Sequence, residues 1–302
     1  MVKWQMASRG HLLPYAALAA VCFFWGTTYL GIRMALESFP PLLLVALRFL
    51  LSGSILLGWA RWKGWTLPEW REVARTAAFG FMLLGVANGC LTFSETWIPS
   101  SLAALFLTTA PFWLAGLESL VPGGERLTAP VAVGLVVGLA GVVMLVLPAG
   151  GGMEMSPNVW KGFLVLQVGS FFWNAGSILQ RRWRATTHPL LTGAVQQMAA
   201  GLVYLVAAAV VPERPVEVTA TGVAGLLWLV TFGSIVGYSA YIYSLETLPV
   251  SLVSIYTFIN PVVAVALGKM FYDEPFGRRE VMAMAVIFVG VGIVKMRALR
   301  RG

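Results

Sequence analysis

Two widely separated segments of the sequence place aromatic and polar side chains within one helical turn. Trp25 and Tyr29 lie four residues apart, and Trp173 and Ser177 repeat this spacing, with Asn174 next to Trp173. Residues three or four apart share one face of an α-helix. Such a face offers ring surfaces to an apolar group and hydrogen-bonding groups to a polar one, which is the chemistry of reversible binding.

Further polar groups occur at helical spacing elsewhere. Asn88 and Thr92 are four residues apart, Tyr238 and Tyr241 are three apart, and Asn260 lies in a later apolar block. A buried amide or phenol must satisfy its donors and acceptors, and it can orient both ends of a zwitterion. The predicted substrate-binding set is Trp25, Tyr29, Asn88, Thr92, Trp173, Asn174, Ser177, Tyr238, Tyr241 and Asn260. The alternative is that these side chains only pack between helices or, for the tryptophans, mark a membrane interface.

Two prolines stand at equivalent places in the sequence. Pro111 and Pro261 each interrupt an apolar block. Proline removes a backbone hydrogen bond and kinks a helix, so both residues are predicted to mark gates. The alternative is that the kinks serve packing alone.

The sequence does not predict catalysis or a bound cofactor. The two histidines, His11 and His188, fall at the ends of apolar blocks. Cys22 and Cys90 have neither a metal-ligand spacing nor a titratable partner nearby in the sequence. An intramembrane enzyme would need a nucleophile with a base, or a metal cluster. We therefore predict no enzyme activity, no metal and no cofactor, and no selectivity sequence indicates an ion channel.

The chain is too apolar for an ordinary soluble domain. Of its 302 residues, 58% are hydrophobic and 11% are charged, whereas soluble domains carry about 25% charged residues. The apolar blocks are roughly 20 residues long, as a helix that crosses a bilayer requires. They predict an all-α integral membrane protein with ten transmembrane helices, near residues 12–32, 41–60, 74–94, 100–120, 129–147, 160–180, 190–211, 221–244, 250–271 and 280–296.

The second half of the sequence repeats the first at a spacing of about 150 residues. A Phe-Phe-Trp motif ends at Trp25 and again at Trp173, and Pro111 and Pro261 are related in the same way. Because each copy contains five predicted spans, an odd number, the second copy must cross the membrane in the opposite sense. Inverted repeats are typical of alternating-access carriers. The predicted repeats are residues 1–150 and 151–302.

The positive charges predict the orientation. The net charge is +8, but the basic residues gather in short loops, which indicates topology and not a nucleic-acid partner. One side of the predicted bundle carries fourteen Lys and Arg residues and the other side six. By the positive-inside rule both termini are cytoplasmic.

A few charged groups lie within or beside the predicted spans. Arg48 is the basic residue placed well inside a span, and we expect it to anchor the helix by extending its long side chain toward the interface. A role as ligand for a substrate carboxylate is the alternative. Glu95, Glu118 and Glu246 fall near span ends, so a proton relay deep in the membrane is not predicted.

Several motifs resemble those of a known family, the EamA-type members of the drug/metabolite transporter superfamily. The likeness covers nearly the whole chain and rests on Phe23-Phe24-Trp25-Gly26, Pro41, Arg48-Phe49, Pro111, Gly124-Glu125-Arg126, Asn260-Pro261 and Asp273-Glu274-Pro275. The resemblance implies a ten-helix bacterial inner-membrane exporter with two inverted repeats and a central site. Within the superfamily the chain is similar to exporters of aromatic amino acids.

These observations together predict a secondary transporter that exports small amphipathic metabolites, above all aromatic or other neutral amino acids, by alternating access. Export of drugs, purines or other metabolites is the alternative. The expected partners are a small-molecule substrate and the lipid bilayer. The sequence leaves open the exact substrate, proton coupling against facilitated efflux, and the oligomeric state.

Overall fold

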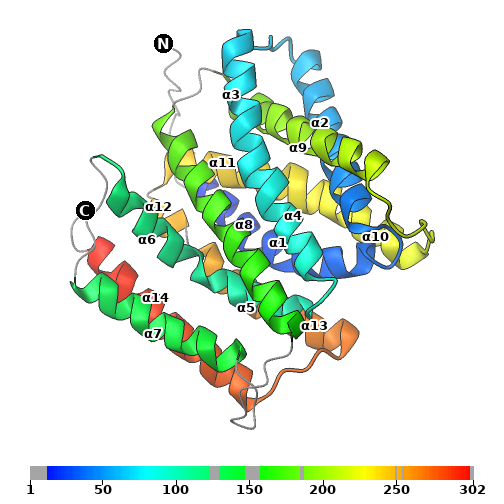
Figure 1. Cartoon of the computed structure of the whole chain (residues 1–302). Coiled ribbons are helices and arrows are strands. Elements are labelled where there is room, and N and C mark those ends of the chain that lie inside the picture. Colours follow the sequence, from blue (N-terminus) through cyan, green and yellow to red (C-terminus); the bar gives the residue numbers. More distant parts are fainter. Residues whose placement is uncertain are drawn as a thin grey trace.

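The computed structural model describes residues 12–122, 129–146, 157–183, 187–248, 250–253 and 255–299. Every regular element among these residues is helical, in agreement with the predicted all-α class (Figure 1). His11, Glu125 and both chain ends lie outside the described residues.

The first half of the chain folds into nine helical elements over the described residues. In chain order they are α1 (Leu13–Ala35), α2 (Pro41–Trp62), α3 (Trp70–Gly80), η1 (Phe81–Val86), α4 (Ala87–Ser94), α5 (Ser100–Phe106), η2 (Leu107–Thr109), α6 (Ala110–Leu120) and α7 (Ala129–Val146). The elements α3, η1 and α4 join into one segment, Trp70–Ser94, and α5, η2 and α6 join into Ser100–Leu120.

The second half has a similar order of elements. They are α8 (Pro157–Arg182), α9 (Pro189–Val210), α10 (Ala220–Trp228), η3 (Leu229–Gly237), α11 (Tyr238–Thr247), α12 (Val250–Val253), α13 (Tyr256–Tyr272) and α14 (Arg278–Leu299). Here α10, η3 and α11 join into one segment, Ala220–Thr247.

Proline and turn residues set several helix boundaries. Pro41 and Pro189 stand in the first turns of α2 and α9. Proline suits this position because the N–H that it lacks would have no partner there. At the other end of a helix, α13 stops at Asp273, which adopts a left-handed conformation with φ 46°.

Seven helical segments in the described chain are long and apolar enough to cross a membrane. They are Leu13–Ala35, Pro41–Trp62, Trp70–Ser94, Ser100–Leu120, Pro157–Arg182, Pro189–Val210 and Ala220–Thr247. Each coincides with a predicted span. The other predicted spans, near 129–147, 250–271 and 280–296, coincide with α7, with α12 and α13, and with α14. The total of ten crossings stays a prediction.

The second helical segments of the two halves, α2 and α9, pack closely against each other. Gly53 on α2 lies against Met198 on α9, and Gly201 on α9 lies against Leu50 on α2. Later residues of α2 thus contact earlier residues of α9, so the two helices are antiparallel. The missing side chains of Gly53 and Gly201 allow this close approach.

The last helical segments of the two halves, α7 and α14, form a second close pair (Figure 1). Gly141 on α7 lies against Ile287 on α14, and Gly290 on α14 lies against Gly138 on α7. These helices are therefore also antiparallel.

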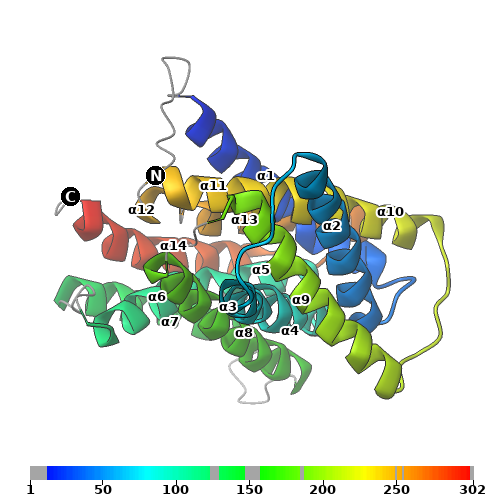
Figure 2. The same ribbon diagram turned by 90° about the horizontal axis from the view of Figure 1, so that it is seen from above.

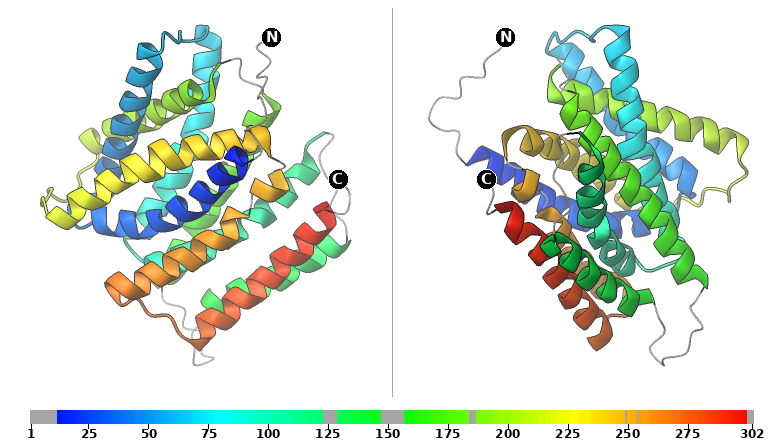
Figure 3. Two further views of the ribbon diagram at one scale, coloured as in Figure 1. Left: turned by 180° about the vertical axis from the view of Figure 1, so that it is seen from behind. Right: turned by 60° about the vertical axis from the view of Figure 1, so that its left-hand side comes forward.

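The first helix of each half packs mainly against the other half. α1 contacts α10, η3, α11 and α13, whereas α8 contacts η1, α4, α5 and α6. In Figure 3, α1 runs between the α10–α11 segment and α13. Seen from above, α4 and α8 lie on one side of the molecule and α1 and α11 on the other (Figure 2). The two halves thus interlock, and the space between them is bordered by both.

One π-helical segment interrupts the long third helix of each half. η1 and η3 occupy equivalent places, at the repeat spacing of about 150 residues. A π turn contains an extra residue, which shifts the side chains that follow it around the helix axis. Such turns are rare and are frequent at functional sites.

Candidate functional site

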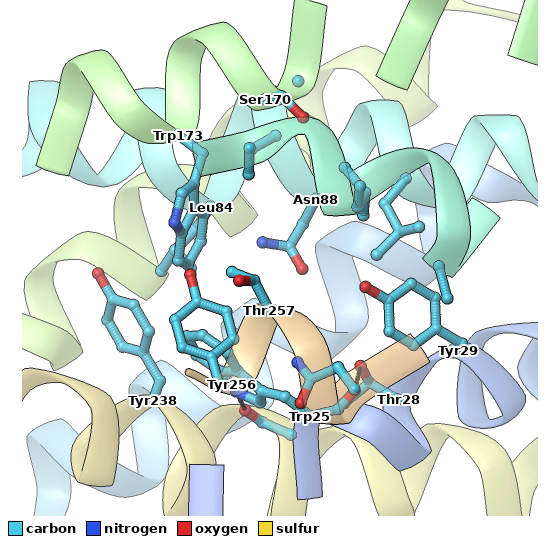
Figure 4. Close-up of a pocket in the computed structure, with 18 of the residues that line it drawn as sticks. Trp25, Thr28, Tyr29, Leu84, Asn88, Ser170, Trp173, Tyr238, Tyr256 and Thr257 are labelled. Carbon is cyan, nitrogen blue, oxygen red and sulfur yellow. Dashed lines mark hydrogen bonds between the residues drawn. The ribbon is translucent and has the colours of Figure 1, made fainter. Parts of the chain in front are cut away.

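A cavity lies between the two halves (Figure 4). The residues that line it come from α1, α2, η1, α4, α5, η2, α6, α8, η3, α11 and α13. The cavity has a volume of about 120 Å³, and one water needs about 10–15 Å³ of such volume. The cavity therefore has room for several waters or for a small organic solute.

The two predicted tryptophans meet in one wall of this cavity. The ring centroids of Trp25 and Trp173 are 5.5 Å apart in an edge-to-face arrangement, and Tyr256 lies 5.2 Å from Trp25. Tyr241 packs behind them, 4.8 Å from Trp25. Edge-to-face and tilted ring pairs are favourable geometries. The result is a rigid apolar wall at one end of the cavity.

Local contacts fix the orientation of Trp25. Its Nε1 donates a hydrogen bond to the carbonyl oxygen of Gly233, at 3.0 Å. Gly237, one turn later, leaves no room for a side chain, because a Cβ there would come 2.6 Å from the same nitrogen. The π segment η3 therefore positions the indole ring through its backbone.

Polar side chains also border the cavity. Figure 4 shows Tyr29 facing Tyr256 and Trp173 across the cavity, with the amide of Asn88 between them. Asn260 also lines the cavity. Its amide nitrogen faces the carbonyl oxygens of Cys22 and Tyr256, at 2.9 and 3.1 Å.

Arg48 lies in the cavity wall and is buried, with 6% of its surface exposed. Its Nε donates to Ser234 Oγ at 2.9 Å, and Nη1 donates to Asn88 Oδ1 at 3.3 Å. The ion pairs of the described chain are Arg181–Glu118 and Lys269–Asp273, so neither neutralises it. The expectation that Arg48 extends to the interface is wrong, because η3 and α4 supply partners inside the protein.

Most of the predicted binding residues gather at this cavity. Six of them line it, namely Trp25, Tyr29, Asn88, Trp173, Tyr238 and Asn260. Tyr241 and Ser177 support the wall from behind, since Ser177 Oγ donates to the carbonyl oxygen of Trp173 at 2.7 Å and lies 3.5 Å from Tyr241 Oη.

Asn174 and Thr92, like Tyr241 and Ser177, do not line the cavity. Asn174 is buried, and its side chain donates to the carbonyl oxygen of Ser170 at 2.8 Å. Thr92 is also buried.

The predicted gate prolines differ in their surroundings. Pro261 lines the cavity and lies inside α13, which continues past it to Tyr272. Pro111 is the second residue of α6, which directly follows the 3₁₀ turn η2, and it is buried beside the lining. A gating role for either residue stays a prediction.

Several lining residues were not in the predicted binding set, among them Thr28, Arg48, Ser170 and Tyr256. Thr28, Ser170 and Tyr256 each lie three or four residues from a predicted member, so the same helical spacing could have found them. Within the described chain, Ser170 Oγ has no hydrogen-bond partner. The place of Arg48 in the cavity wall follows only from the fold.

At one end of the bundle a carboxylate links the two halves. Glu274, which follows α13, accepts hydrogen bonds from Ser100 N and Oγ at 2.9 and 2.8 Å and from Ser101 N at 2.8 Å. Burial raises the pKa of Glu274, but the hydrogen bonds from Ser101 and Ser100 outweigh this effect, and the pKa lies below its usual value. We name the contacts of Glu274 with Ser100 and Ser101 the Glu274 clamp.

No group of three or more His, Cys, Asp or Glu residues is arranged to hold a metal ion in the ranges that the structure describes.

Comparison with known proteins decides the family. The sequence profile of the EamA-like transporter family matches the chain twice, over residues 12–147 and 160–296. The chain belongs to this family. It is an EamA-type member of the drug/metabolite transporter superfamily, and thus a multi-pass membrane transporter.

Relatives of this EamA-like transporter support the assignment. The uncharacterized inner membrane transporter YedA of Escherichia coli strain K12 is 34% identical over 290 residues, which cover 94% of this chain and 92% of YedA. Protein PecM of Dickeya dadantii is 28% identical over 277 residues, which cover 90% of this chain and 88% of PecM. One crystal structure superposes with a TM-score of 0.70 at 21% identity, over 95% of this chain and 98% of the other, which shows a shared fold.

Proposed function

We propose that this protein is a secondary transporter of the bacterial inner membrane that exports small amphipathic metabolites by alternating access. Its preferred solutes are aromatic or other neutral amino acids. The cavity between the halves is the binding site, and rocking of the halves opens it to each side in turn.

The composition of the cavity carries this proposal. At one end the rings of Trp25, Trp173 and Tyr256 form an apolar wall. Arg48 and Asn88 add a buried guanidinium and an amide to the lining. An amino acid combines an apolar side chain with a carboxylate and an ammonium group, so it matches both the apolar and the polar parts of the lining.

The antiparallel pairs support inversion of the second repeat. α2 and α9 occupy equivalent places in the predicted repeats, and so do α7 and α14. If the two copies crossed the membrane in the same sense, equivalent helices would run parallel to each other. The two matches of the family profile, to 12–147 and 160–296, fall on the same division of the chain.

Localisation and orientation follow from the relatives and the charges. YedA is described as an inner membrane transporter. The predicted cytoplasmic loops carry most Lys and Arg residues, so the clamp end of the bundle, with Glu274, faces outward in this proposal.

The proposal is tested by transport into liposomes that contain the purified protein. Each of the twenty amino acids is supplied with a radioactive label, and uptake is compared with that of empty vesicles. We expect saturable uptake of aromatic and neutral amino acids. Uptake no greater than in empty vesicles for all twenty would contradict the amino acid assignment.

Competition distinguishes the alternative substrates. If the carrier exports purines or drugs, unlabelled purines or hydrophobic cations should block uptake more strongly than phenylalanine does. If it exports amino acids, phenylalanine and tryptophan should compete best, because their rings fit the aromatic wall.

A further inference from the structure

Glu95 directly follows α4 and is completely buried, with 0% of its surface exposed. Within the described part of the chain, neither of its carboxyl oxygens has a hydrogen-bond partner. Its position at a predicted span end suggests contact with water, but the fold encloses it. Buried polar groups in folded proteins nearly always have partners, so this exception requires an explanation.

Glu95 lies close to the transport cavity. Asn88 and Leu91, which line the cavity, precede it by seven and four residues. Those spacings place all three residues on one face of the helical segment. Glu95 therefore stands one turn beyond the cavity, between the cavity and the Glu274 clamp.

Charged and titratable groups from the surrounding elements act on Glu95. Arg33 and Tyr29 on α1, Arg48 on α2, and Glu274 after α13 lie within electrostatic range. On α8, Lys161 is held over the ring of Trp97, 3.9 Å from its centroid.

The arginines do not pair with this carboxyl group in the described structure. Arg33 Nη1 donates to the backbone oxygen of Glu95, at 3.3 Å, and Arg48 bonds to Ser234 and Asn88. Both cations are therefore directed at other acceptors.

The two carboxyl groups at this end of the bundle have opposite surroundings. Glu274 accepts three hydrogen bonds that stabilise an ionised carboxylate. Glu95 accepts none, and the nearby negative charge of Glu274 further opposes its ionisation. A buried carboxyl group without partners is most stable when it is protonated.

We propose that Glu95 is a proton-binding site, uncharged in this conformation, whose proton is exchanged when the clamp end of the bundle opens. Opening admits water to the end of α4, so the carboxyl group can take up a proton from outside there. The proton moves between water and one carboxyl oxygen, and no other bond changes.

Proton binding at Glu95 rests on geometry alone, whereas its coupling to transport rests also on the proposed function. The empty carrier closes its clamp end only with Glu95 protonated. It therefore takes a proton from outside each time it returns for a new solute. When the cavity, one turn away, opens inward and binds solute, Glu95 releases that proton to the cytoplasm. Each cycle then carries one proton inward, and the proton gradient drives export.

Infrared spectroscopy of the purified protein in lipid vesicles tests the site without any substrate. At neutral pH the wild type should show the C=O stretching band of a protonated carboxyl group. The Glu95→Gln variant should lack that band. Glu246→Gln, a control at an exposed glutamate near another helix end, should keep it.

The same measurement can overturn the proposal. A wild type without the band at neutral pH would do so, and so would an undiminished band in Glu95→Gln. If Glu95→Gln does not fold, a pH titration of the wild type replaces it. A band lost near pH 4.3, the ordinary pKa of glutamate, would then contradict a protonated Glu95.

Coupling is tested in liposomes with labelled phenylalanine. An inward proton gradient should accelerate efflux at least several-fold in the wild type but leave efflux by Glu95→Gln unchanged, while exchange of internal for external phenylalanine persists in both. Acceleration of the variant to the same degree would overturn coupling at Glu95. Absence of flux in the wild type would contradict the proposed function and leave the infrared result standing.

Discussion

Trp173 and Trp25 are brought together by two helices that lie far apart in the sequence. Their edge-to-face contact at 5.5 Å makes each ring a support for the other. A solute that stacks on this wall meets a surface whose position is already fixed, so little conformational entropy is lost on binding. Binding through ring surfaces also tolerates variation in solute shape, which suits a carrier of several related metabolites.

The wall makes a clear prediction for Trp173. Trp173→Ala should weaken solute binding by roughly tenfold to a hundredfold, because a large apolar contact is lost. The concentration for half-maximal uptake in liposomes measures this. Trp160→Ala is a matched control on the same helix, because Trp160 is 41% exposed and lies outside the cavity lining. Equal losses in both variants would remove Trp173 from the binding site.

Arg48 makes a second prediction at this scale. Arg48→Lys keeps the positive charge but cannot reach Ser234 and Asn88 together, because an ammonium group lacks the planar fork of a guanidinium. We expect transport to fall at least tenfold with the protein still monodisperse. Arg61→Lys, at an exposed position, should transport normally. Uptake by Arg48→Lys at the wild-type rate would show that simultaneous hydrogen bonds to Ser234 and Asn88 are not needed.

The sequence predicted these side chains unequally. Helical spacing pointed to Trp25, Trp173 and Asn88, because each has another aromatic or polar residue four positions later on the same helix face. Arg48 was expected to reach the interface. Its partner inside the protein, Ser234, is 186 residues away, and no local sequence pattern reveals this contact. The burial of Glu95 depends in the same way on packing among several helices.

Among the elements, the π segments η1 and η3 both contribute to the shape of the cavity. Leu84 lies in η1 and Asn88 follows it closely, whereas Gly233 and Ser234 lie in η3. The apolar blocks predicted helices here, but hydrophobic periodicity does not separate a π turn from an α turn. The boundaries and approximate lengths of the helices could thus be predicted, and the shift of side chains around the axis could not.

The Glu274 clamp predicts a pH-dependent stability. The pKa of Glu274 in the folded protein lies below its unfolded value. Its contribution is therefore present at neutral pH and is lost as the pH falls through the folded pKa. Glu274→Gln should destabilise the protein by about 2 kcal/mol at pH 7, because hydrogen bonds to a charged group are lost.

Apparent melting temperatures in detergent measure this effect. The difference between the wild type and Glu274→Gln should be largest at pH 7 and should shrink below about pH 4. Asp273→Asn is the neighbouring control, since Asp273 is exposed and asparagine tolerates its left-handed backbone. A difference that stays constant with pH would contradict an ionised clamp.

At the scale of the whole molecule, the proposed alternating access depends on how the two halves interlock. α1 packs on the second half and α8 packs on the first. Equivalent helices, α2 with α9 and α7 with α14, meet in antiparallel pairs. If the two halves exchange conformations in such an arrangement, a cavity that was open at one end becomes open at the other end.

The central claim is that the two halves cross the membrane in opposite senses around this shared cavity. Single cysteines at Lys63 and Val216, which lie in exposed and equivalent connections after α2 and α9, test it directly in variants in which Cys22 and Cys90 are replaced. In intact cells a membrane-impermeant thiol reagent should label Val216→Cys and not Lys63→Cys, and inside-out vesicles should give the reverse. Labelling of both positions from the same side would contradict the account.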